Sequence, residues 1–265
     1  MKTSSEKFAL HFHEKGRGLP LPLIHGFPFS SRMWDRQLDS LSQTARVLTP
    51  DLPGFGETPA SSSTSVEKLA EDCAALLDAL GSSEPAVIGG LSMGGYIALA
   101  FVRLFPTRVR GLILASTRAG ADSAEGKANR DKSIAQVKES GPSSVIAAMH
   151  PKLLAPSTYS EQAALTEELK EIMQESSSEG VVAALTAMRD RPDSTPLLGK
   201  ISVPTLVIHG KEDAIIPPSE AQLMAAEIPH SELHLIEKAG HLPNMEQPEK
   251  FNRIVVNFLH KIIEK

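Results

Sequence analysis

Short apolar segments alternate with longer amphipathic ones along most of the chain, and this order restricts the fold more than any other feature of the sequence. Several apolar segments are nearly continuous, which is typical of strands buried on both faces of a parallel sheet. The amphipathic segments between them have helical periodicity. Strands that alternate with helices predict an α/β fold, with a mostly parallel central sheet and helices on both faces. The expected strands are residues 20–26, 46–52, 85–91, 109–117, 203–210 and 231–240.

The alternation breaks between residues 118 and 196, where helical patterns follow one another without an intervening strand. We interpret residues 118–196 as a helical cap inserted into an α/β core of residues 1–117 and 197–265. Open α/β folds bind their ligands at the carboxyl edge of the sheet, so we expect the cap to cover that edge. Its methionines either line a pocket there or hold the cap helices together; they are Met149, Met173 and Met188.

The composition is that of an ordinary globular protein and disfavours several classes of function. The 265 residues carry a net charge of −5, which gives no electrostatic reason to expect a nucleic acid or a membrane as partner. The single cysteine, Cys73, excludes an internal disulfide and a multi-cysteine metal site, and its helical surroundings indicate a buried position. The N-terminal stretch lacks the apolar segment of a signal peptide, so we expect a cytoplasmic protein.

A serine among glycines stands between an expected strand and an expected helix. The stretch Gly90-Leu91-Ser92-Met93-Gly94 fits the G-x-S-x-G pattern of a nucleophile elbow, a sharp turn that exposes the serine hydroxyl. Glycines on both sides prevent collisions between this turn and its neighbours. The helix N-terminus also favours negative charge that develops there. In the alternative interpretation the serine only caps the helix, but the strand–turn–helix context favours the elbow.

Two further residues complete a predicted catalytic triad. A serine needs a base to become a nucleophile at neutral pH, and His241 lies on a loop between the last strand and the last helix. The base needs an acid that holds its tautomer, and Asp213 follows the penultimate strand at the same edge of the sheet. Its neighbour Glu212 is less well placed. A surface-loop histidine and a solvated carboxylate are the alternatives for these two residues.

The oxyanion of a tetrahedral intermediate needs backbone N–H donors. We expect one donor to be the amide of Met93, directly after the serine, and the other to lie in the loop after the first central strand. In that loop Phe27 is the candidate, because Pro28 has no N–H. The reaction predicted from these residues uses no cofactor and no metal ion.

Five segments of the sequence together carry a family resemblance: HGFPFSSRMWDRQ, DLPGFGETP, GLSMGGYIALAF, VPTLVIHGKEDAIIP and AGHLPNMEQPEKFN. They resemble the α/β-hydrolase superfamily over nearly the whole chain. Within it they are similar to the group of carboxylesterases, 3-oxoadipate enol-lactonases and non-haem haloperoxidase-like proteins. The resemblance implies the triad and the oxyanion donors named above, in the order Ser…Asp…His of that superfamily. It also implies a structural turn, without a catalytic role, at Asp51.

These observations predict a serine hydrolase that acts on a small-molecule carboxylic ester with a short to medium acyl chain. The main alternative is hydrolysis of a lactone or enol-lactone, with perhydrolysis when peroxide replaces water. A different class of function is a catalytically silent member of the fold that binds a small ligand. The cap segment is rich in alanine and charge, which disfavours a lipase that works at an oil–water interface.

Overall fold

The computed structural model describes residues 10–61 and 64–264 and confirms the α/β fold. Its seven-stranded sheet has the order β1-β3-β2-β4-β5-β6-β7, in which only the pair β1 and β3 is antiparallel. The strands are β1 (Phe12–Lys15), β2 (Pro20–Ile24), β3 (Arg46–Pro50), β4 (Ala86–Leu91), β5 (Val109–Ala115), β6 (Thr205–Gly210) and β7 (Ser231–Ile236). All six expected strands are present. Strand β1 is not among the six expected strands, because its four residues lie at the sheet edge, are mostly exposed and show no apolar run.

The side chains of β5 show how the sheet is buried on both faces. Leu112 and Leu114 belong to the core that packs against α2 and α3, whereas Ile113 and Ala115 belong to the core on the opposite face. All four are at most 1% exposed. Successive residues of a strand point to opposite faces, so a strand covered on both sides needs an unbroken apolar run.

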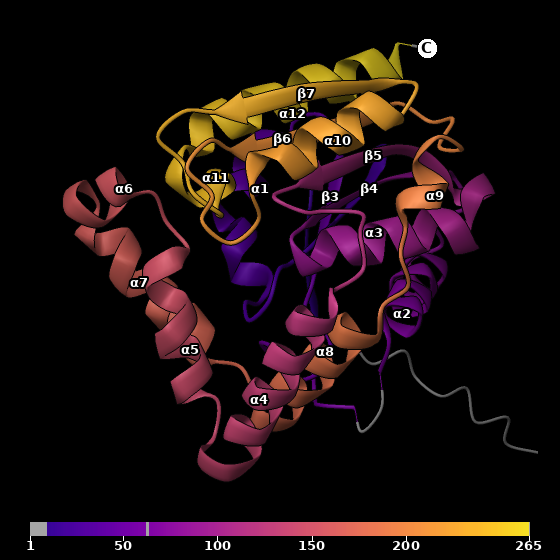
Figure 1. Ribbon diagram of the computed structural model, residues 1–265. Coiled ribbons are helices and arrows are strands. Elements are labelled where there is room, and N and C mark those ends of the chain that lie inside the picture. Colours follow the sequence, from indigo (N-terminus) through magenta and orange to yellow (C-terminus); the bar gives the residue numbers. More distant parts are fainter. Residues whose placement is uncertain (1–9, 62–63, 265) are drawn as a thin grey trace, which may run out of the picture.

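Helices cover both faces of the sheet (Figure 1). One face carries α2 (Val66–Ala79), α3 (Met93–Leu104) and α10 (Pro218–Glu227). The other carries α1 (Asp35–Leu41), α11 (Pro243–Glu246) and α12 (Pro248–Ile263). Short 3₁₀ turns lie at Ser31–Trp34, Pro106–Arg108 and His150–Lys152. No helix among the described residues has the length and apolarity needed to cross a bilayer.

Residues 1–9, which belong to the stretch on which the expectation about a signal peptide depends, lie outside the described residues.

The segment between β5 and β6 contains helices and no strand. It holds α4 (Ala124–Ser140), α5 (Ser143–Met149), α6 (Pro156–Glu161), α7 (Ala163–Gln174), α8 (Ser178–Asp190) and α9 (Thr195–Leu198). Helices α4 and α8 lie side by side, and α5 to α7 form a second arm (Figure 1). We keep the name cap for residues 118–196, as a proposal about how the chain is divided.

Strand β4 ends in a sharp turn that leads directly into α3. Ser92, between them, has φ 55° and ψ −112°, a conformation that residues with a side chain rarely adopt. A Cβ atom on Gly90 would overlap the carbonyl of Gly94, and a Cβ on Gly94 would overlap the carbonyl of Ile24 at the end of β2. The two glycines therefore allow three backbone segments to meet where the serine stands.

We expect Gly90→Ala to lower the free energy of unfolding by about 2–4 kcal/mol, because its methyl group has to displace backbone atoms. The control is Gly120→Ala, where an added Cβ meets no atom within 4 Å, and where the change stays within about 0.5 kcal/mol. Urea denaturation of the two variants measures both effects. Equal stabilities would show that the close approach at the turn does not limit this position.

Candidate active site

Ser92 is held at the carboxyl end of β4 by contacts with the next strand. Its amide donates to the carbonyl of Ala115 (2.9 Å), and its carbonyl accepts a hydrogen bond from the Thr117 hydroxyl (2.8 Å). These bonds hold the backbone in its strained conformation. The side chain makes no hydrogen bond to any described residue, and the residue is 8% exposed. Ser92 therefore offers an unengaged hydroxyl at the N-terminus of α3.

The structure brings His241 and Asp213 into direct contact, although they are 28 residues apart. His241 Nδ1 lies 2.8 Å from Asp213 Oδ2, and both side chains are fully buried. A neutral histidine that donates from Nδ1 carries its free lone pair on Nε2. That Nε2 atom is buried and has no partner among the described residues, and no hydrogen bond joins it to Ser92. In enzymes without bound substrate, catalytic hydrogen bonds are often long or poorly aligned and tighten only when substrate binds.

Asp213 is held as an ionised, acceptor-only group. Its Oδ1 accepts the amides of Ile215 (2.8 Å) and Ile216 (3.0 Å), and His209 Nε2 lies 3.1 Å from its Oδ2. Burial by itself raises the pKa of the Asp213 carboxyl. The charge of His241 and the hydrogen bonds from His209, His241 and the Ile216 amide outweigh burial and hold this pKa well below its ordinary value. Glu212, the alternative acid, has an exposed side chain.

The two expected oxyanion donors have free amides. Neither the N–H of Met93 nor that of Phe27 has an acceptor among the described residues. The loop that carries Phe27 approaches the serine closely, because a Cβ built on Gly26 would lie 3.4 Å from the Ser92 Cβ. The same loop is fixed by His25, which donates from Nδ1 to the Gly26 carbonyl (2.9 Å) and accepts the Leu52 amide at Nε2 (3.0 Å).

A buried carboxylate that the sequence analysis missed supports the loop of His241. Glu246 Oε1 accepts the amides on both sides of the histidine, those of Gly240 (2.7 Å) and Leu242 (3.3 Å). Its Oε2 accepts the Ala155 amide and the Thr158 hydroxyl of the cap, each at 2.7 Å. Burial raises the pKa of Glu246, against the opposing effect of these hydrogen bonds. The only signal in the sequence is a glutamate five residues after the histidine.

A pocket of about 450 Å³ lies between this edge of the core and the cap. Ser92 and Tyr96 line it at the turn, Phe27 from the loop after β2, and Ile215 and Ile216 from the loop that follows Asp213. The pocket thus reaches the expected nucleophile, the expected oxyanion loop and the loop of the expected acid. No cluster of three metal-ligating side chains occurs among the described residues.

The remaining expectations have mixed outcomes. Met149 and Met188 line the pocket, whereas Met173 is fully buried among other apolar side chains and does not line it.

Asp51 accepts the amides of Ser31 (2.7 Å) and Glu57 (3.0 Å), as a residue that fixes a turn would. Cys73 is buried in α2, and burial raises the pKa of its thiol to about 12.

Comparison with known proteins identifies the family. A family model described as the alpha/beta hydrolase fold matches residues 20–248. The chain belongs to this family and is a hydrolase of it.

Three relatives show which enzymes it resembles. A thermophilic esterase from Thermogutta terrifontis, solved with malate bound, is 43% identical, with a TM-score of 0.94 over 96% of this chain and 93% of that one. The 2-hydroxymuconate semialdehyde hydrolase of Pseudomonas putida is 31% identical over 95% of this chain and 91% of its own. The 3-oxoadipate enol-lactonase 2 of Acinetobacter baylyi is 31% identical over 84% of this chain and 82% of its own. The expected resemblance to esterases and enol-lactonases is confirmed.

We expect Glu246→Gln to slow the reaction of Ser92 with a fluorophosphonate probe about tenfold, because an amide NH₂ would replace one of the two acceptor oxygens and face an N–H or O–H donor. The control Glu249→Gln removes the same charge at an exposed position three residues away and leaves the labelling rate unchanged. Unfolding curves recorded alongside show what fraction of each variant is folded. A labelling rate that falls only in proportion to the unfolded fraction would contradict a positioning role.

The pH dependence of stability should report on His25. Burial lowers the pKa of His25 from 6.5 to about 4. The unfolded chain therefore takes up a proton near pH 6.5 and the folded chain only near pH 4, so stability falls as the pH drops through this window. We expect this histidine to contribute roughly 3 kcal/mol of that loss. Denaturation of the wild type and of His25→Gln at several pH values between 4 and 6.5 measures this loss. If the free energy of unfolding of both proteins falls by the same amount across this range, the loss does not come from His25.

Proposed function

We propose that this hydrolase cleaves small carboxylic esters through an acyl-enzyme intermediate on Ser92. The observation that carries the proposal is the buried Asp213–His241 pair at the same edge of the sheet as Ser92: neither His241 Nε2 nor the Ser92 hydroxyl has a hydrogen-bond partner among the residues that the structure describes. A nucleophile, a base and an acid that orients the base are the groups that this chemistry requires.

The proposed reaction proceeds in two halves. Ser92 Oγ attacks the ester carbonyl carbon while His241 Nε2 takes the hydroxyl proton. The amides of Phe27 and Met93 stabilise the negative oxygen of the tetrahedral intermediate. The C–O bond to the alcohol then breaks, and His241 returns its proton to the leaving alcohol. A water molecule attacks the acyl-enzyme with the same assistance, which releases the carboxylic acid and restores the serine.

The pocket supports substrates of modest size. Its volume of about 450 Å³ is within the usual range for small-molecule sites. Apolar side chains from the cap, including Val145 and Leu185, line the pocket and provide an apolar surface for a short or medium acyl chain. Polar and charged side chains of α4 line it as well, which suits a soluble ester better than the long chains of a triglyceride.

Hydrolysis of a lactone is the second candidate, favoured by the enol-lactonase relative at 31% identity. The same triad opens a lactone, because the ring C–O bond takes the place of the bond to the alcohol. Attack by peroxide instead of water on the acyl-enzyme would give a peracid. These reactions differ in the shape of the substrate and in the second nucleophile. Because they share Ser92, His241 and Asp213, variants of these residues test all of them together.

We expect Ser92→Ala to lower kcat on 4-nitrophenyl butyrate by at least about 10⁴-fold, and Ser92→Ala/His241→Ala to be little worse, because members of one catalytic unit are not additive. Asp213→Asn should cost about 10³-fold or more. The control is Ser116→Ala, since Ser116 also has a positive φ at a strand end but does not line the pocket. The butyrate should be cleaved faster than the palmitate. A Ser92→Ala variant that keeps most of the activity would refute the acyl-enzyme, and a wild type that no fluorophosphonate labels would indicate a silent binder.

A further inference from the structure

The pocket is positively charged although the protein is negatively charged. Three cationic side chains line it, Arg118, Arg130 and Lys152, and the only carboxylate among the described lining residues is Asp122. Their formal charge is +2, against −5 for the whole chain. A concave surface with this excess charge attracts anions and repels cations.

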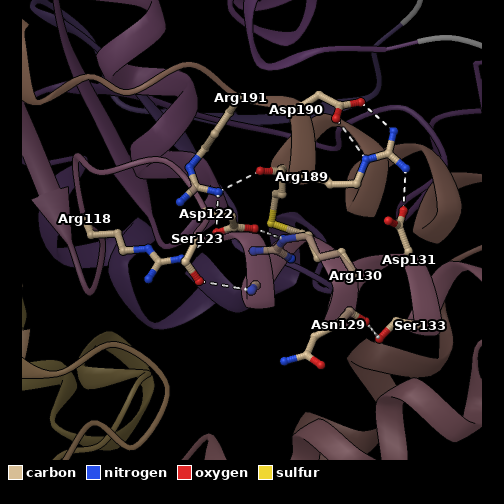
Figure 2. A network of polar contacts seen from close by, with 12 residues as sticks. Arg118, Asp122, Ser123, Asn129, Arg130, Asp131, Ser133, Arg189, Asp190 and Arg191 are labelled. Carbon is tan, nitrogen blue, oxygen red and sulfur yellow. Dashed lines mark hydrogen bonds and ion pairs between the residues drawn. The ribbon is translucent and has the colours of Figure 1, made fainter.

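Asp122 is shared by three arginines and cannot neutralise them. Arg118, Arg130 and Arg191 all donate to this carboxylate, which is 1% exposed (Figure 2). Arg191 is itself 2% exposed and lies 2.8 Å from Asp122. It also donates to the carbonyls of Met188 and Gly120, each at 2.7 Å, and stacks over the ring of Tyr96. Arg191 thus connects the end of α8 to the core. Its ion pair with Asp122 leaves less of that negative charge to balance Arg118 and Arg130.

Arg118 and Arg130 keep donors that no described residue satisfies. A guanidinium has five N–H groups, and Arg130 uses only its Nε on Asp122. The Nε of Arg118 is buried and has no acceptor. Burial lowers the pKa of the Arg118 guanidinium, but Tyr96 and Asp122 outweigh burial and raise it, with a smaller contribution from Glu220, which forms no ion pair with Arg118. Lys152, exposed at the pocket, has no ion pair with a described residue.

Arg118 and Arg130 are partly buried, and this increases the free energy that an anionic ligand can gain by binding to them. The side chains of Arg118 and Arg130 are 29% and 21% exposed, so each has lost much of its hydration. Partial burial of a charged group costs free energy unless a counter-charge and hydrogen bonds replace water. A carboxylate provides both, because its two oxygens match the planar fork of a guanidinium.

We infer that Arg118 and Arg130, together with Lys152, which lines the same pocket, form a carboxylate-binding subsite in the pocket of Ser92. The cleavage part of this inference rests on the proposed function, whereas the binding part does not. The substrate class is then a half-ester of a dicarboxylic acid: one carboxylate binds the arginines while the esterified carboxyl reaches the serine. Hydrolysis adds one water across the ester C–O bond and yields the dicarboxylic acid and the alcohol.

The test compares two esters of equal size, monoethyl glutarate and its neutral monoamide, ethyl glutaramate. We expect the wild type to have at least about a tenfold higher kcat/KM for the charged ester. Arg130→Gln should lower that ratio about tenfold, mainly through KM for the charged ester. Lys138→Gln removes a positive charge from the same helix outside the pocket and should leave the ratio unchanged. Arg118→Gln is the second variant.

Direct binding separates the subsite from the chemistry. Calorimetric titration of Ser92→Ala with glutarate should show binding that weakens about tenfold in Arg130→Gln and with added chloride. A wild-type ratio near one, together with glutarate affinity that Arg130→Gln does not change, would overturn the subsite even if the neutral ester is hydrolysed. Glutarate binding without hydrolysis of either ester would support the subsite and refute the proposed function. A network that only holds the fold would lower the Tm of Arg130→Gln and leave both the ratio and the affinity unchanged.

Discussion

The meeting of three backbone segments at the start of α3 determines the position of Ser92 and of the loop that carries Phe27. The helix can approach the ends of β2 and β4 this closely only because Gly90 and Gly94 have no side chains. The same approach places the loop after β2 beside Ser92, so that the expected oxyanion donors and the expected nucleophile lie close together. A protein interior is dense enough that a single methyl group would disturb this arrangement.

The expected base is attached to the cap as well as to the core. The amide of His241 donates to the carbonyl of Leu153 (2.8 Å), and Glu246 bonds to the histidine loop with one oxygen and to the cap with the other. Core contacts hold Asp213 and Ser92. The cap therefore does more than cover a pocket, because it contributes to the orientation of the imidazole. Changes in this segment should affect turnover as well as substrate choice.

The sequence predicted the sheet and the covering helices, and it singled out Ser92, Asp213 and His241 as triad candidates, because each depends on local patterns: apolar runs, glycines at a turn and polar residues at strand ends. It did not predict groups whose meaning depends on distant partners. Glu246 looks like a solvated residue of a helix start until the cap is placed over it. Arg130 lies in the charge-rich stretch KANRDKSIAQVKES, which is typical of an exposed helix. Arg191 reaches Asp122 across 69 residues of sequence.

The charged residues of the cap have two different roles, and only the fold shows which residue has which role. The high content of charged residues in the cap disfavours a surface that inserts into lipid. As geometry, Arg130 and Lys152 reach the pocket, whereas Arg189 forms ion pairs with Asp131 and Asp190 outside it. Surface pairs of this kind contribute little to stability. An unbalanced cluster in a cavity instead determines which ligands can enter, because each additional carboxylate on a ligand meets positive charge that is already partly desolvated. A protein of net negative charge repels anions at long range, so the attraction is confined to the pocket, within a Debye length of the arginines. Selectivity for an anionic ester should therefore come mainly from how long the substrate stays bound and less from how fast it arrives.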